Sequence, residues 1–306
     1  MFIAFTAPIQ QTNEAMLFQL WFLLLVPGLP FGVFLFWCHR TVKRRDREYR
    51  RPFDAMPRPA GYSLQQRTGE LWESISENLM FCLISGVVAW SLYFSNISGF
   101  WIPLILGMAA CSFSALRAMR LVIKHSNHRL GLLGEQVVGQ ILDRCCSDTI
   151  RVFHDLEVIE PGKKPWNIDH VVLTTAGVFA IETKTRRKPK DTSPGIREGH
   201  KVIFDGQQLF FPAPMEADRH GLDQAKANAD WLAGKLTALN GAPVSVAPVL
   251  VLPGWWVEAK GKGPVAAFNP KSLPGFLTGR STVLSPAQFN AINAQLEERC
   301  RIDLTR

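Results

Sequence analysis

Hydrophobic residues follow two different patterns along the chain. Within the first 128 positions they form three long runs, at residues 17–37, 79–94 and 97–116, and no charged residue interrupts any of them. Such runs match or approach the roughly 20 apolar residues that a helix needs to cross about 30 Å of hydrocarbon. The pattern predicts about three transmembrane helices, and because only two residues separate the last two runs, these form a helical hairpin. Burial of the runs as core helices of a soluble protein is the alternative, which the absence of charge disfavours.

The distribution of charge supports a membrane segment and gives it an orientation. The net charge is +8, but residues 129–306 hold 22 Lys/Arg against 19 Asp/Glu, so the excess belongs mainly to residues 1–128, with 12 against 7. Basic residues follow the first and third runs, and none precedes the first run. By the positive-inside rule the N-terminus lies outside and the C-terminal half in the cytoplasm. The stretch 38–78 is then a cytoplasmic linker, in which residues 49–68 lack periodicity.

After position 129 the pattern changes to the spacing of an α/β domain. Apolar residues at helical spacing predict helices over residues 131–145 and 218–239 and a last helix opening at Ser285-Pro286. Alternating or continuously apolar segments predict strands at 151–159, 167–174, 178–184 and 244–252, and Asp205-Gly206 predicts a small hairpin within 201–211. The order αβββαβ indicates a mixed central sheet. We expect a cytoplasmic domain at 129–306, with its core at 129–253 and a helical C-terminal extension.

Several functional classes are excluded by missing motifs. The chain has no G-x-G-x-x-G, no P-loop and no G-x-S-x-G, which argues against dinucleotide, nucleotide-phosphate and serine-hydrolase sites. Its six cysteines show neither C-x-x-C nor zinc-ligand spacing. A disulfide framework is therefore not expected, and this usage fits a reducing compartment. Together with the compact anchor, it suggests a bacterial inner membrane.

An acid on one strand next to an acid and a lysine on the following strand is the strongest chemical signal. Asp169 lies within an apolar strand, and Glu182 and Lys184, two residues apart, share a face of the next strand. If the strands pair, the two carboxylates can hold Mg²⁺, which polarises a phosphate and lowers the pKa of a bound water. Lys184 would orient or deprotonate that water. Taken alone, the common Glu182 and Lys184 pattern favours an ordinary surface ion pair at a strand end, and only Asp169 on the preceding strand makes a metal site an equal alternative.

The surrounding motifs resemble the NERD (nuclease-related) domain of the PD-(D/E)xK, restriction-endonuclease-like superfamily. The resemblance rests on Gly134-Glu135, residues 167–170, residues 177–184 and Gln224. It implies a restriction-endonuclease-like αβββαβ core and hydrolysis of nucleic acid, DNA rather than RNA, with Mg²⁺ or Mn²⁺. Glu135, Asp169 and Glu182 would bind the metal, and Lys184 would be the catalytic lysine with Gln224 beside it. Cleavage of both strands would favour a homodimer, and the lipid bilayer would be a further partner.

Some alternatives stay open at this level. Gln224 could face solvent, and His170 is expected on the opposite face from the acids. The basic run 186–190 could bind a nucleic-acid backbone or form a solvated loop. The residues after Lys184, Thr185-Arg186-Arg187, differ from the small and glycine-rich continuation common in the family, so the substrate geometry is open. Because family resemblance does not establish activity, an inactive membrane protein that binds nucleic acid or a partner protein is the second hypothesis.

Overall fold

The computed structural model describes residues 33–34, 36–44, 55–94, 101–189, 198–212 and 217–303. The described chain divides into two compact units. One contains residues 70–94 and 101–124 with the helical residues near 33–44, and the other contains residues 55–69 together with the described part of 125–306. The first predicted membrane segment, 17–37, lies almost wholly outside the described residues.

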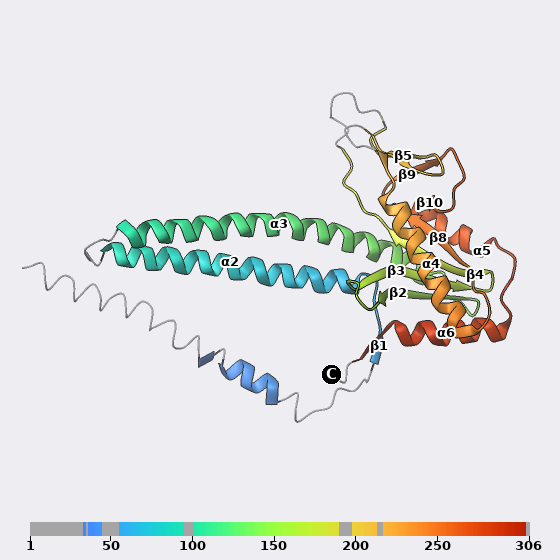
Figure 1. Cartoon of the computed structure of the whole chain (residues 1–306), viewed down its shortest axis with the longest axis horizontal. Coiled ribbons are helices and arrows are strands. Elements are labelled where there is room, and N and C mark those ends of the chain that lie inside the picture. The colour runs from blue at the N-terminus through green and yellow to red at the C-terminus, as the bar shows by residue number, and fades with distance from the viewer. Residues whose placement is uncertain are drawn as a thin grey trace, which may run out of the picture. The chain divides into compact units, whose positions relative to one another are not determined.

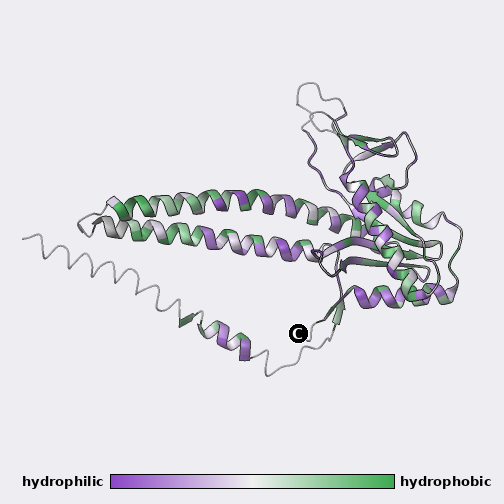
Figure 2. Ribbon diagram, viewed as in Figure 1, coloured by the Kyte–Doolittle hydropathy of each residue, from purple (hydrophilic) through white to green (hydrophobic). Residues whose placement is uncertain are grey.

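Two long helices, α2 (Tyr62–Phe94) and α3 (Trp101–Asp143), account for the second and third hydrophobic runs. The stretches Tyr62–Ala89 and Leu104–Asp143 are long and apolar enough to cross a membrane, by length and composition alone. In their most apolar windows only 6% and 11% of the residues are buried, unlike core helices of a soluble domain. Figure 2 shows that the most hydrophobic parts lie in the C-terminal half of α2 and the N-terminal half of α3.

Two helix boundaries differ from the prediction. The linker predicted at 38–78 contains a short strand, β1 (Ala55–Pro57), and the first turns of α2, because Gly61 is the last helix-breaking residue before Tyr62. The membrane run 97–116 and the helix predicted at 131–145 are not separate within the described residues, since α3 runs unbroken from Trp101 to Asp143. No proline or glycine cluster lies between residues 117 and 130, so the polar side chains there change the environment of the helix without ending it.

The central sheet has five strands in the order β10-β8-β4-β3-β2 (Figure 1). Strands β2 (Ile150–Val158), β3 (Trp166–Thr174) and β4 (Gly177–Thr183) are antiparallel neighbours, whereas β8 (Val246–Val251) and β10 (Ala266–Phe268) continue the sheet in parallel. The β4 to β8 connection passes through α4 (His220–Asn240). The mixed α/β fold and the predicted order of core elements are therefore confirmed.

Both faces of this sheet are covered by helices. One face packs on α4 and α6 (Pro286–Arg299) through a cluster that includes Val171, Ala180 and Leu232. The other face packs on the C-terminal turns of α3 and on α5 (Leu273–Thr278), with Val138, Leu142 and Ile181 fully buried. The 3₁₀ turn Pro270–Ser272 leads into α5. Burial on both faces explains why the strands read as nearly continuous apolar runs.

Additional strands lie outside the predicted core. A small sheet has the order β7-β6-β5-β9, formed by β5 (Lys201–Phe204), β6 (Leu209–Phe210), β7 (Ala217–Asp218) and β9 (Trp256–Ala259). The predicted hairpin around Asp205-Gly206 is its β5–β6 pair. β1 pairs with β11 (Arg301–Asp303). The region expected to be purely helical after 253 thus also contains β9, β10 and β11, whose three or four residues are too short to show a period.

Candidate functional site: buried carboxylates around Lys184

The end of β4 carries Glu182, which is almost completely buried at 2% exposure. Its Oε1 lies 2.8 Å from the Lys184 ammonium, and its Oε2 accepts a 3.0 Å hydrogen bond from the Asn228 amide. Burial raises the pKa of Glu182, while Lys184 acts against this rise. Both carboxylate oxygens are therefore held in fixed positions by groups that favour the charged form.

Lys184 connects this strand to α4. Its ammonium donates a 2.8 Å hydrogen bond to Gln224 Oε1 while it pairs with Glu182, and its side chain is about one third exposed. Gly221, on the first turn of α4, leaves room for the lysine stem, because a Cβ at this position would lie 3.0 Å from Lys184 Cγ. The lysine is thus anchored at two oxygens and still reaches solvent. Gln224, for which a solvent-facing position was open, contacts the site.

Asp169, on β3, lies beside the end of β4. Its Oδ2 accepts a 2.7 Å hydrogen bond from the Thr183 backbone amide, which fixes the side chain against the neighbouring strand. Burial, together with repulsion from Glu182 and Glu135, raises the pKa of Asp169 well above its ordinary value. The fixed orientation explains how an acid is accommodated within an apolar strand.

Glu135 reaches the same region from α3. It lies in the part of that helix that belongs to the compact unit of the sheet, after the hydrophobic run 97–116, and is 5% exposed. Its Oε2 is buried and accepts no hydrogen bond from any residue that the structure describes. Burial, and then repulsion from Asp155 and Glu182, raises the pKa of Glu135 to about 8. A buried carboxyl oxygen without a partner is costly and is the kind of atom that a bound cation would satisfy.

The donor set fits a hard divalent cation in its chemistry. Glu135, Asp169 and Glu182 supply carboxylate oxygens, the ligands that Mg²⁺ prefers, and their mutual repulsion would be relieved by a cation. Their present geometry does not converge on one point: within the described ranges, no three His, Cys, Asp or Glu side chains form a ready metal-holding group. Lys184 occupies the Glu182 oxygen that a metal would need.

The site contains a residue that the sequence did not single out. Asn228 lies one turn after Gln224 on α4 and is 3% exposed. It donates to Glu182 and accepts a 3.2 Å hydrogen bond from the Trp166 indole. Its signal in the sequence is a polar residue within the buried stripe of α4, between Ala225 and Leu232.

Asp155 is a second residue that the pattern did not indicate. Its backbone is left-handed, with φ of 51°, in the middle of β2. Its fully buried carboxylate accepts hydrogen bonds from Ser63 (2.6 Å) and Asn167 (2.8 Å), while Arg58 donates to its carbonyl oxygen (3.2 Å). These bonds attach the chain before and at the start of α2 to the sheet and place a further negative charge near Glu135.

His170 faces away from the acids, as predicted. Its Nδ1 lies 2.8 Å from Nδ1 of His154, whose Nε2 in turn lies 2.9 Å from the Asp143 carboxylate. His170 is completely buried, and burial lowers its pKa well below the ordinary value. The neighbouring acid and histidine therefore serve different faces of β3, and His170 does not join the carboxylate cluster.

The basic residues that follow Lys184 each contact a different part of the domain. The Arg186 guanidinium pairs with Asp218 and stacks on Phe211. Arg187 bonds to Ser126 and Asn127 on α3, and Lys188 lies over the Trp255 ring. Lys190 lies outside the described residues.

These features define an α/β domain with a buried carboxylate–lysine cluster at the end of two adjacent strands. Comparison with protein families agrees with this class: residues 130–253 match the family model NERD, the nuclease-related domain. The chain therefore carries a nuclease-related domain, and its mixed sheet is consistent with a nuclease-like fold. Neither the curated proteins nor the solved structures gave a match.

Proposed function

We propose that this protein is a membrane-tethered, Mg²⁺-dependent nuclease that hydrolyses phosphodiester bonds of nucleic acid, with DNA as the preferred substrate. The observation that carries the proposal is the meeting of Glu182, Lys184 and Gln224 at one strand end, with Asp169 buried nearby and Glu135 close enough to raise the pKa of Asp169. This cluster lies inside the segment that matches the nuclease-related domain.

Each residue has a role that follows from its surroundings. Asp169, Glu182 and Glu135 would hold Mg²⁺ or Mn²⁺, which when bound would supply Lewis acidity toward the phosphate and a bound water of lowered pKa. Lys184, once released from Glu182 Oε1, would orient or deprotonate the attacking water and offset negative charge on the phosphate. Gln224 keeps the ammonium near the strand end, and Asn228 keeps Glu182 from rotating away.

The tether consists of α2 and α3, together with the apolar run 17–37 of the sequence. Supporting it are the exposed apolar side chains of both helices, among them Leu83, Ile84 and Leu106, and the basic residues Arg117 and Arg120 beyond the third run. The proposed topology has the N-terminus outside and the C-terminal domain in the cytoplasm of a bacterial cell. Nucleic acid and Mg²⁺ are both available there.

Cleavage by the full chain in detergent tests the proposed activity. With Mg²⁺ present, the wild type should degrade a fluorescent DNA duplex, and Glu182→Ala and Lys184→Met should each lower the rate by at least about 100-fold, the scale of a lost catalytic group. Lys226→Met is the matched control, because Lys226 lies on the same helix as Gln224 but pairs with Asp230 at the surface. Equal rates for wild type and Glu182→Ala would refute the assignment, and a parallel RNA substrate tests the preference for DNA.

The second candidate is a non-catalytic domain that binds nucleic acid or a protein partner. It is favoured by the contact of Lys184 with Glu182, which occupies a metal-ligand oxygen, and by the lack of a ready metal-holding group among the described residues. This candidate predicts salt-sensitive binding without turnover, unchanged by Lys184→Met.

A further inference from the structure

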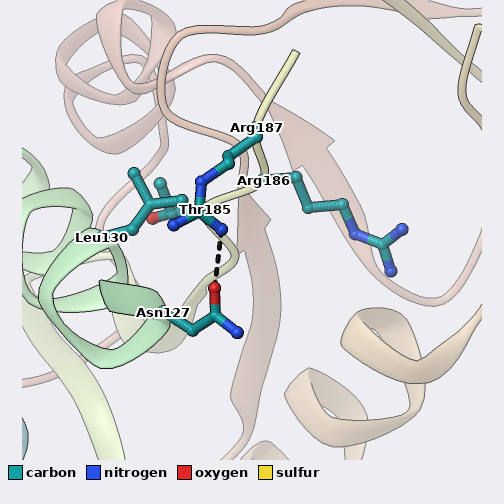
Figure 3. A pocket seen from close by; sticks show the side chains of 5 residues that line it. All are labelled: Asn127, Leu130, Thr185, Arg186 and Arg187. Atoms are coloured by element: carbon teal, nitrogen blue, oxygen red, sulfur yellow. Dashed lines mark hydrogen bonds between the residues drawn. The ribbon is translucent and has the colours of Figure 1, made fainter. Parts of the chain in front are cut away.

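An open cavity lies between α3 and the segment that directly follows Lys184. It measures about 320 Å³ and is lined by Asn127, Leu130, Thr185, Arg186 and Arg187 (Figure 3). This volume falls at the lower end of the range for small-ligand sites. All five residues belong to the same compact unit as the sheet.

Arg187 supplies a positive charge at this cavity that no acidic residue in the described part of the chain offsets. Its guanidinium donates to Asn127 Oδ1 (2.6 Å) and to Ser126 Oγ (2.9 Å), which are neutral acceptors. Within the described ranges, no carboxylate forms an ion pair with Arg187, and the residue is exposed. Its two contacts on α3 orient the planar group without neutralising it.

The other basic residues of the run are committed elsewhere. Figure 3 shows the Arg186 side chain pointing away from Arg187 and Asn127, consistent with its pairing to Asp218. Lys188 lies 5.9 Å over the Trp255 ring. Of the described positive charges in the run 186–190, Arg187 is therefore the one best placed to take a new anionic partner.

The position of Arg187 in the chain limits what that partner can be. It lies three positions after Lys184, so their Cα atoms are at most about 11 Å apart. Successive phosphates of one DNA strand lie farther apart than their axial rise of about 3.4 Å, because they also wind around the helix, so this reach covers about two nucleotides. A phosphodiester bond at Lys184 would thus bring a neighbouring phosphate of the same strand to the cavity.

We propose that this cavity is a phosphate-binding subsite, in which Arg187 contacts the nucleic-acid backbone within about two nucleotides of the bond at Lys184. Asn127 and Ser126 hold the guanidinium plane in place, and the N–H groups of its planar fork that these bonds leave free can donate charge-assisted hydrogen bonds to phosphate oxygens. Asn127 and Ser126 are positioning residues. The subsite rests on the proposed function, since it assumes a nucleic-acid strand at Lys184. The part of the nucleic acid that Arg187 would recognise is the phosphate backbone.

Binding to a fluorescent DNA duplex, measured by anisotropy with the full chain in detergent and without divalent metal, tests the subsite. Arg187→Gln should weaken binding by about 5- to 20-fold and reduce the slope of log Kd against log salt by about 1. Arg187→Lys should retain the salt slope and recover part of the affinity, because it keeps the charge without the fork. Lys226→Gln removes one surface charge from α4 as the matched control and should leave both quantities unchanged.

The outcomes separate the subsite from catalysis. Salt-dependent binding that requires Arg187, without cleavage by the wild type in Mg²⁺, supports the subsite and contradicts the nuclease assignment. Cleavage with an unchanged affinity and salt slope in Arg187→Gln overturns the subsite and leaves the nuclease assignment intact. Absence of DNA binding by the wild type overturns the subsite as well. Equal thermal stability of Arg187→Gln and the wild type excludes misfolding as the cause of a weaker affinity.

Discussion

Replacing Glu135 by Gln should change how the stability of the domain depends on pH. The pKa of Glu135 is about 8 in the folded chain, against an ordinary value of 4.5, mainly because of burial. Between these values the folded state keeps the proton that the unfolded state releases, so the free energy of unfolding falls as pH rises. Glutamine cannot ionise, so the free energy of unfolding of the Glu135→Gln variant does not show this fall with rising pH.

The size of this change in the free energy of unfolding follows from the raised pKa of Glu135. One pH unit within the window corresponds to about 1.4 kcal/mol, so the wild type should lose about 3 kcal/mol relative to Glu135→Gln between pH 5 and pH 7.5. Below pH 4.5 the contribution of this group is constant, and above pH 8 the loss is complete. Coupling to Asp169 and Glu182 broadens the transition, because the three carboxyls titrate together.

Urea unfolding of the full chain in detergent, followed by tryptophan fluorescence, measures this difference without added metal. Glu298→Gln on α6 provides the control, since Glu298 is exposed and its replacement should leave the pH profile as in the wild type. Parallel stability profiles of Glu135→Gln and the wild type from pH 5 to pH 7.5 would show that Glu135 is not buried beside other acids, and the proposed ligand set would lose one member.

Three further predictions concern the same site. Asn228→Leu should lower the free energy of unfolding by about 1–3 kcal/mol and reduce cleavage, because Glu182 Oε2 loses its buried hydrogen-bond donor. Urea denaturation and cleavage rates measure the two effects, and unchanged values would contradict the positioning role of Asn228. Gly134→Ala should impair cleavage, because the added Cβ would overlap the Thr185 hydroxyl, and adding Thr185→Gly should restore much of the rate; strictly additive effects would refute this packing. Mg²⁺ should raise the melting temperature of the wild type more at pH 7.5 than at pH 5, because ligand carboxyls must be deprotonated, and it should have little effect on Asp169→Asn.

The core helices and strands could be predicted from the sequence because the hydrophobic residues of each follow a regular spacing. Alternation and apolar runs marked β2, β3, β4 and β8, and the antiparallel pairing of β3 and β4 brings Asp169 next to the end of β4, where Glu182 lies. The close approach of Lys184 to Gln224 depends on α4 crossing this strand end, which only the resemblance to the nuclease-related domain implied and helical spacing alone did not.

Other features could not be read from local patterns. Asn228 has no distinctive local pattern, and only the packing of α4 on the sheet places it beside Glu182. Asp155 has a left-handed backbone within a segment whose alternating pattern predicts a regular strand. The continuity of α3 also differs from the prediction, because the polar residues after 116 end the hydrophobic run without ending the helix. In each case the local structure depends on contacts with distant residues or on the surroundings of the helix, and neither is visible in a local sequence pattern.

The most direct test of the central claim is the Mg²⁺-dependent cleavage of DNA by the full chain in detergent, compared between the wild type and Glu182→Ala. The account predicts cleavage by the wild type that EDTA abolishes and excess Mg²⁺ restores, with a rate at least about 100-fold lower for Glu182→Ala at equal DNA affinity. Cleavage that survives EDTA, or that proceeds equally fast in Glu182→Ala, would contradict it.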